Sequence, residues 1–154
     1  MSITNIEDQS NRYQIIWDLG RRCSYACTYC PPHRNNKWSP FLDYKKLCDT
    51  VDKVAEYALL YDEFRKEPAL KKLSFTGGEP TVHPDFFRFL KYVKNTYPFF
   101  SRGLTTNGWF HDSVLDKVMS LTTGGTLSYH CESTEKQKKQ VVKNAIALRE
   151  KFKV

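Results

Sequence analysis

The sequence predicts an α/β protein in which parallel strands alternate with helices. Short runs rich in β-branched and aromatic residues alternate four times with longer segments whose apolar residues recur every three or four positions. This alternation indicates a parallel sheet, because a right-handed crossover between parallel strands is normally made by a helix. The chain has 154 residues, which is the usual length of one domain.

The first two strand–helix units occupy the amino-terminal half of the chain. Residues 13–19 (YQIIWDL) form a β-rich run, and after a cysteine-rich and polar stretch residues 43–61 show helical spacing of Leu, Val and Ala. Residues 70–75 are the second strand, which two glycines end, and residues 84–97 are the second helix. The proline in its first turn favours a helix start.

The last two units follow without a linker or a repeat. Residues 101–105 are the third strand, closed by an Asn-Gly turn pair, and residues 112–121 repeat the helical pattern. Residues 125–131 are expected to form the fourth strand. The sequence TEKQ is a capping-box signature that opens the last helix, expected over residues 134–152.

Composition and charge narrow the class of protein. Hydrophobic residues make up 40% and charged residues 27%, as in an ordinary folded globular domain. No apolar run reaches the roughly 18 residues of a membrane span, and residues 1–10 lack the apolar centre of a signal peptide. We therefore expect no membrane partner and a cytoplasmic location. The net charge of +7 favours acidic partners.

Unusual residues follow each of the first three predicted strands and end the fourth. Ligands of such sheets collect at the carboxyl ends of the strands, so these residues are expected to meet at one edge. The four groups are the cysteines of CSYACTYC, Gly77-Gly78-Glu79-Pro80, Thr105-Thr106-Asn107-Gly108 and Ser128-Tyr129-His130-Cys131.

The cysteine group indicates a metal or cluster site. Cys23, Cys27 and Cys30 lie within eight residues, whereas Cys48 and Cys131 stand alone. Soft thiolates select zinc, copper(I) or iron–sulfur clusters. With His33 as a fourth ligand the group would be a Cys3His zinc site. With three thiolates on a cubane cluster, one iron would stay open to a small molecule.

These motifs together resemble the radical S-adenosylmethionine (radical SAM) enzymes. CxxxCxxC with an aromatic residue, Tyr29, before the last cysteine is that family's signature, and the GGEP motif that starts at Gly77 is similar to its GGEP motif. The words WDL, FT and LTTNG around these motifs are also similar. The resemblance extends over about residues 13–131.

The resemblance implies two cofactors and assigns residues to each. Cys23, Cys27 and Cys30 would hold three irons of a [4Fe–4S] cluster, and S-adenosylmethionine would chelate the fourth iron. The other expected contacts are the backbone at Gly77, Gly78 and Glu79 for the methionine amino group, Thr105, Asn107 and Ser128 for the carboxylate and ribose, and the main chain of Tyr29 near the adenine. Reductive cleavage of S-adenosylmethionine would yield a 5′-deoxyadenosyl radical that abstracts hydrogen from a small-molecule, nucleotide or peptide substrate.

The resemblance also implies the architecture and the partners. Family cores are usually six βα units in a partial (β/α) barrel of TIM type, of which about four are expected here. Residues 1–154 would then form one radical SAM core domain that is incomplete at its carboxyl end, and a partner chain could complete the barrel. A reducing donor such as flavodoxin or ferredoxin would supply the electron.

Two other readings stay open. One is a non-catalytic, truncated cluster-binding fragment, and the other is a zinc-binding basic module that binds RNA. Ser128 and His130 have the same parity along the expected fourth strand and would share a face. If that face is the barrel interior, both would point towards the substrate space, although a core histidine is the commoner case. Cys48 is expected to be a buried hydrophobe.

Overall fold

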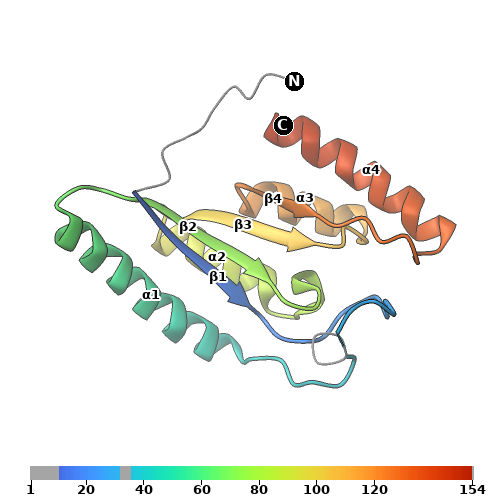
Figure 1. Cartoon of the computed structure of the whole chain (residues 1–154), viewed down its shortest axis with the longest axis horizontal. Coiled ribbons are helices and arrows are strands. Elements are labelled where there is room, and N and C mark those ends of the chain that lie inside the picture. Colours follow the sequence, from blue (N-terminus) through green and yellow to red (C-terminus); the bar gives the residue numbers. More distant parts are fainter. Residues whose placement is uncertain (1–10, 32–35, 154) are drawn as a thin grey trace.

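Four parallel strands form one sheet in the order β1-β2-β3-β4. The computed structural model describes residues 11–31 and 36–153. The strands are β1 (Arg12–Asp18), β2 (Leu70–Thr76), β3 (Ser101–Thr106) and β4 (Gly124–Leu127), and each runs in the same direction as its neighbour (Figure 1). The predicted α/β class with a parallel sheet is therefore confirmed.

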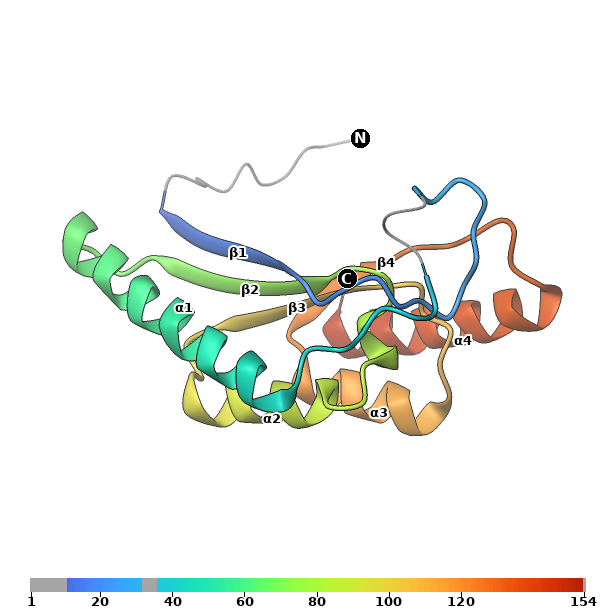
Figure 2. The same cartoon turned by 90° about the horizontal axis from the view of Figure 1, so that it is seen from below.

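The helices cover a single face of this sheet. Each crossover contains one of them: α1 (Tyr44–Arg65), α2 (Phe86–Thr96), α3 (Asp112–Leu121) and finally α4 (Glu135–Phe152) after the last strand. A 3-10 turn, η1 (Pro80–Val82), precedes α2. Figure 2 shows the helices below the sheet and the loop after β1 rising at the other side. Among the described residues, no helix thus covers the upper face of the sheet.

Alternation along the strands separates the two faces. In β2, Leu73 and Phe75 are fully buried against the helices, whereas Lys72 and Ser74 point to the uncovered face. Phe75 meets the rings of two α2 residues, Phe86 and Phe89, each at a centroid distance of 5.7 Å. Truncation of such a buried ring to alanine costs about 3–5 kcal/mol, so this aromatic cluster anchors α2 to the sheet.

Side-chain caps fix where two helices begin. The Asp43 carboxylate accepts the Lys46 N–H at 2.8 Å and starts α1, which continues beyond the expected residue 61 to Arg65. Thr134 and Gln137 form the capping box that the sequence predicts for α4. Among the described residues, no helix is long and apolar enough to cross a membrane.

The fourth strand is shorter than predicted. β4 ends at Leu127, so residues 128–131 are not part of the sheet. The Ser128 N–H donates to the Thr106 carbonyl at 2.8 Å, and the chain then leaves the sheet for the loop after β1. Because β4 lies at the edge of the described sheet, no further strand in the described residues extends its pairing.

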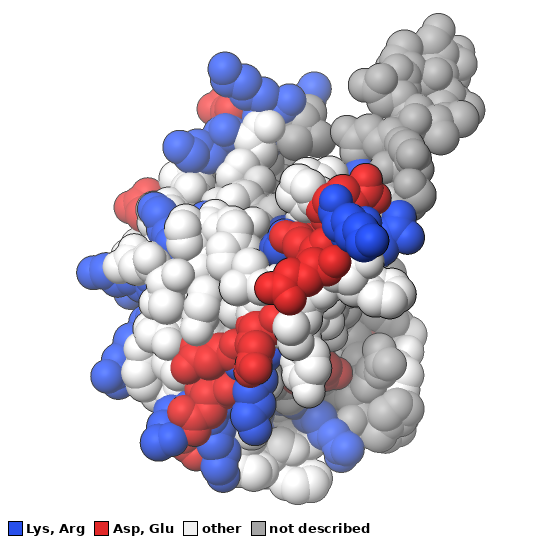
Figure 3. Space-filling view, turned by 90° about the vertical axis from the view of Figure 1, so that its left-hand side faces the viewer, with Lys and Arg blue, Asp and Glu red and all other residues white. Residues whose placement is uncertain are grey.

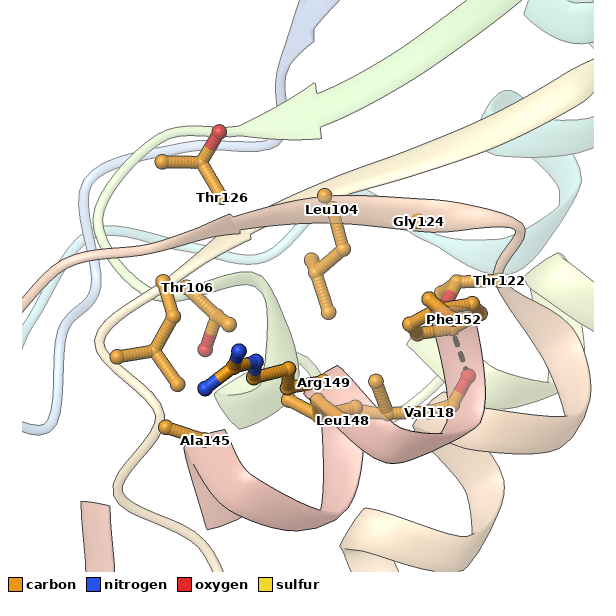
Figure 4. Close-up of a pocket in the computed structure, with 12 residues that line it drawn as sticks. Leu104, Thr106, Val118, Thr122, Gly124, Thr126, Ala145, Leu148, Arg149 and Phe152 are labelled. Atoms are coloured by element: carbon orange, nitrogen blue, oxygen red, sulfur yellow. Dashed lines mark hydrogen bonds between the residues drawn. The ribbon is translucent and has the colours of Figure 1, made fainter. Parts of the chain in front are cut away.

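The layer beneath β4 is incompletely filled. A cavity of about 190 Å³ lies between β3, β4 and α4, lined chiefly by apolar side chains that include Leu104, Leu148 and Phe152 (Figure 4). Gly124 and Gly125 supply no side chain here. A Cβ at Gly125 would lie 2.0 Å from the Leu104 carbonyl oxygen, so close pairing with β3 requires glycine at this position.

Candidate functional site

A cavity of about 290 Å³ lies at the carboxyl ends of the strands, between the cysteine loop and the sheet. Nine of the ten predicted site residues line it: Cys23, Cys27, Cys30, Tyr29, Gly77, Gly78, Thr105, Asn107 and Ser128. Thr76 and His130 also line it. The four groups of unusual residues therefore meet at one place, as the parallel topology predicts.

The cysteine loop is closed at its base by residues on both sides. Arg22 and Asn36 form an isolated parallel bridge, in which the Cys23 N–H donates to the Asn36 carbonyl at 3.3 Å. The Arg22 guanidinium lies 4.5 Å from the centre of the Phe41 ring and also donates to the Ser39 carbonyl at 2.5 Å. Arg22 thus holds the loop in place, which accounts for its charge without an anionic ligand.

All three motif cysteines are free thiols and half buried. Burial raises the pKa of the Cys23 thiol, and hydrogen bonds from the Tyr25 N–H at 3.4 Å and the Asn107 amide at 3.9 Å oppose this shift. A ligand must be a thiolate, so metal binding would displace the Cys23 proton. The two N–H donors then have a charged sulfur to stabilise.

The donor set suits a cluster better than a single ion. The described residues contain no group of three ligating side chains close enough to hold one metal ion. In a cubane each thiolate binds a different iron, so the sulfurs need not converge on one point. His33, the proposed fourth zinc ligand, lies outside the described residues. Three soft thiols facing one cavity therefore fit a [4Fe–4S] cluster.

The two glycines after β2 pack directly against the start of the cysteine loop. A Cβ at Gly78 would lie 2.2 Å from the Arg22 carbonyl oxygen, and one at Gly77 would lie 2.6 Å from the Gly20 carbonyl oxygen. Gly77 also has a φ of +128°, which disfavours any side chain. The Gly78 N–H donates to Gly20 at 2.7 Å. Glycine is required here first of all for contact between loops.

Glu79 is the predicted site residue whose side chain does not line the cavity. It is 2% exposed, and its carboxylate accepts the Thr106 hydroxyl at 2.8 Å and the Asn107 N–H at 2.7 Å. It also accepts the hydroxyl of Thr81 at 2.7 Å. The carboxylate thus joins the GGEP segment to the end of β3, and Glu79 is not among the residues that line the cavity.

The Asn107 side chain also forms its hydrogen bonds within the protein. Its amide donates to the Ser24 hydroxyl at 2.9 Å, and its side-chain oxygen accepts the Trp109 N–H at 2.9 Å. These bonds tie the segment after β3 to the cysteine loop. The Asn-Gly pair therefore combines the turn role with a place in the cavity wall.

Two residues of the β4–α4 loop, residues 128–134, contact the middle of the cysteine motif. Nδ1 of His130 lies 3.4 Å from Cys27 Sγ, and the Glu132 carboxylate accepts the Thr28 N–H at 2.7 Å. The Thr28 hydroxyl and the Thr28 N–H, which both donate to this carboxylate, hold the pKa of Glu132 below its usual value. The sequence pattern singled out His130 for the wrong reason, a strand face, and missed Glu132 because no periodic signal marks a loop carboxylate.

The remaining cysteines stay apart from the cavity. Cys48 in α1 packs against the core but is only half buried, not fully buried as expected, and Cys131 is exposed. Neither lines the cavity.

The comparisons with known proteins agree with this geometry. Residues 17–152 match the family model of the Radical SAM superfamily. GTP 3′,8-cyclase of Aquifex aeolicus is 27% identical over 141 residues, which are 88% of this chain and 40% of the relative. GTP 3′,8-cyclase of Nautilia profundicola is 28% identical over 99 residues, which are 63% of this chain and 28% of the relative. The chain thus spans well under half the length of these relatives.

The fold has a solved counterpart. The structure of BtrN in complex with AdoMet and 2-DOIA superposes with a TM-score of 0.61 at 16% identity, over 84% of this chain and 55% of BtrN. This likeness confirms the predicted fold class, a partial (β/α) barrel of TIM type. Members of the matched superfamily are enzymes that bind a [4Fe–4S] cluster and S-adenosylmethionine, so the predicted cofactors are confirmed at family level.

With the family match over nearly all described residues, the cysteine loop on the cavity and the barrel-type sheet, the chain belongs to the radical SAM superfamily.

Proposed function

We propose that the chain is a radical SAM enzyme core in which Cys23, Cys27 and Cys30 hold the [4Fe–4S] cluster. The observation that carries the proposal is the shared cavity: these thiols and the glycine pair Gly77-Gly78 line the same space of about 290 Å³. When bound, the cluster delivers one electron to the sulfonium of S-adenosylmethionine, which releases methionine and the 5′-deoxyadenosyl radical that takes hydrogen from a substrate.

The residues of the chain bind and orient the cofactor. The amino group of S-adenosylmethionine is a hydrogen-bond donor, so carbonyl oxygens near Gly77, Gly78 and Glu79 are suited to receive it. The N–H groups of Gly78 and Glu79 are used for the cysteine loop and do not compete with it. Thr105, with Ser128 on the neighbouring strand end, supplies hydroxyls to the carboxylate and ribose.

The adenine end and the substrate occupy the remaining space. Tyr29 lines the cavity beside Cys30 and is proposed to place its main chain near the adenine. Asp18 and Thr76 pair across β1 and β2 at the cavity edge of the uncovered sheet face, which offers polar groups to a substrate. The relatives make GTP the first nucleotide to test, with small molecules and peptides as the other classes.

The electron donor and the compartment follow from the same chemistry. A cluster with an open iron needs a low-potential donor and a reducing environment, so we propose a flavodoxin or ferredoxin partner in the cytoplasm. The net charge of +7 suits an acidic donor. Because β4 has an unpaired outer edge in the described part of the sheet, a partner chain that completes the barrel is part of the proposal.

Cleavage of S-adenosylmethionine tests the proposal. The anaerobically reconstituted chain, reduced with dithionite, is incubated with S-adenosylmethionine, and 5′-deoxyadenosine is measured by mass spectrometry. The parent chain and Cys48→Ala are expected to form it, and Cys30→Ala is expected to form none. A parent chain that holds the cluster but forms no 5′-deoxyadenosine would favour the second candidate function, a non-catalytic cluster-binding fragment. That candidate is supported by the outer edge of β4, which no described strand pairs.

A further inference from the structure

The β4–α4 loop contacts three consecutive residues at the centre of the cysteine motif. Glu132 accepts the Thr28 N–H at 2.7 Å and also the Thr28 hydroxyl. Nδ1 of His130 lies 3.4 Å from Cys27 Sγ and forms a hydrogen bond with the Tyr29 hydroxyl. The residues 27–29 are therefore held by side chains more than a hundred positions later in the chain.

The His130 ring is fixed from two sides. Its centroid lies 5.1 Å from that of Tyr25 in an edge contact, and 5.9 Å from that of Tyr29 with the rings nearly parallel at 11°. Both tyrosines lie two positions from Cys27, one on each side. Packing between these rings restricts rotation of the imidazole, so Nδ1 is directed at the Cys27 sulfur by the motif's own side chains.

The ring nitrogen is suited to donate. A thiolate sulfur only accepts hydrogen bonds, so the tautomer with its proton on Nδ1 can donate to Cys27, and it shares this single N–H with the Tyr29 oxygen. Hydrogen bonds to the sulfurs of an iron–sulfur cluster stabilise its reduced, more negative state and raise its reduction potential. Cys23 has donors of its own in the Tyr25 N–H and the Asn107 amide, so His130 supplies Cys27 with the corresponding bond.

We propose that the β4–α4 loop is a clamp on the cluster site, in which Glu132 positions the backbone at Thr28 and His130 donates a hydrogen bond to the Cys27 sulfur. The proposal rests on the proposed function, since it assumes that Cys27 is a cluster ligand. His130 thereby sets the potential at which the cluster accepts its electron, and Glu132 is a positioning residue that acts through Thr28.

The reduction potential of the reconstituted full chain tests the role of His130. Iron and sulfide are counted first, and the midpoint potential is then measured by a redox titration followed by electron paramagnetic resonance. His130→Leu removes the donor, whereas His130→Asn keeps an amide N–H near the position of Nδ1. Cys131→Ser, an exposed neighbour outside the cavity, is the matched control.

The expected result is a cluster in every variant, with a midpoint about 59 mV lower in His130→Leu, which is a tenfold weaker one-electron reduction. His130→Asn is expected to recover part of the shift, and Cys131→Ser to match the parent. Equal midpoints in His130→Leu and the parent would overturn the proposal. Loss of iron in both His130 variants would also overturn it, because packing of the ring, and not its N–H, would then be what matters.

Glu132 is tested without any cluster. In the apo chain, amide hydrogen exchange of a peptide that contains Thr28 reports the hydrogen bond to Glu132. Glu132→Ala is expected to speed this exchange at least tenfold, and Cys131→Ser to leave it unchanged. Unchanged exchange in Glu132→Ala would contradict the clamp. A parent chain that binds no iron would instead refute the proposed function, so the two failures are distinguishable.

Discussion

Buried polar side chains of the predicted site bind the loops to one another before they bind any ligand. Glu79 is the clearest example. This residue is 2% exposed, and its carboxylate accepts hydrogen bonds from Thr81, Thr106 and Asn107. A family motif predicts that a glutamate stands at this position. It does not predict that the side chain turns away from the cavity, because that depends on donors 27 and 28 positions later.

Replacement of Glu79 by glutamine is therefore expected to destabilise the fold. The new amide would face donors at the end of β3, and a buried donor without an acceptor costs about 1–3 kcal/mol. Urea denaturation of the apo chain measures the free energy of unfolding. Glu56→Gln on the exposed side of α1 is the matched control and is expected to change it little. Equal losses in both variants would contradict the role assigned to Glu79.

His83 links stability to pH at the start of α2. Its Nε2 donates to the Leu42 carbonyl at 3.0 Å and its Nδ1 accepts the Asp85 N–H at 3.1 Å, so the neutral ring fits the site. Burial lowers its pKa from 6.5 in the folded chain. A proton then binds the unfolded chain more readily, and stability is lost as the pH falls below 6.5.

Thermal melts on both sides of pH 6.5 check this expectation. The parent chain is expected to lose melting temperature on the acid side, and His83→Gln to lose less of it. His111→Gln, an exposed residue at the start of α3, is the control for removing a histidine. The account of His83 fails if His83→Gln and the parent show the same acid-side loss.

The elements themselves follow the periodicity of the sequence closely, and they depart from it where a tertiary contact decides. α3 spans residues 112–121 as predicted, and β3 extends one residue beyond its predicted end. β4 ends at Leu127. Beyond this residue the chain leaves the sheet and contacts the cysteine loop, where the Glu132 carboxylate accepts the Thr28 N–H. A contact between loops leaves no period in the sequence, so neither the strand end nor the clamp could be predicted.

A polar residue within the apolar face of α4, Asn144, attaches this helix to the segment that follows β3. Asn144 is fully buried, and its amide donates to the carbonyls of Gly108 and Phe110, each at 2.8 Å. Asn144→Ala leaves both carbonyls without this donor and is expected to lower the free energy of unfolding by about 1–3 kcal/mol. Asn95→Ala on exposed α2 surface is the control, and urea denaturation is the measurement. A loss no larger than that of Asn95→Ala would refute this attachment.

At the scale of the molecule, the sheet has one face packed and one face open. Residues on the open face, such as Ile16 at 69% exposure and Leu70 at 67%, are apolar yet unburied by the described residues. Parallel sheets are normally covered on both faces, as in a closed barrel whose interior is filled. The sequence predicts this partial barrel through its four units and its resemblance, and the likeness to BtrN agrees with it.

On the side of the molecule that Figure 3 shows, positively and negatively charged side chains are mixed. There Lys and Arg side chains are interspersed with Asp and Glu. The net charge of +7 therefore does not mark this side as a docking face for an acidic partner. Composition predicts the sign of the net charge but not where the charged side chains lie, because their position depends on how the helices pack.

The central claim is that three thiols on one loop hold a cluster, and a count of iron and sulfide tests it most directly. In the anaerobically reconstituted chain we expect about four irons and four sulfides per chain. Cys23→Ala, Cys27→Ala and Cys30→Ala are each expected to lose the cluster, while Cys48→Ala keeps it. One zinc ion per chain in place of iron, or loss of iron in Cys48→Ala, would contradict the account.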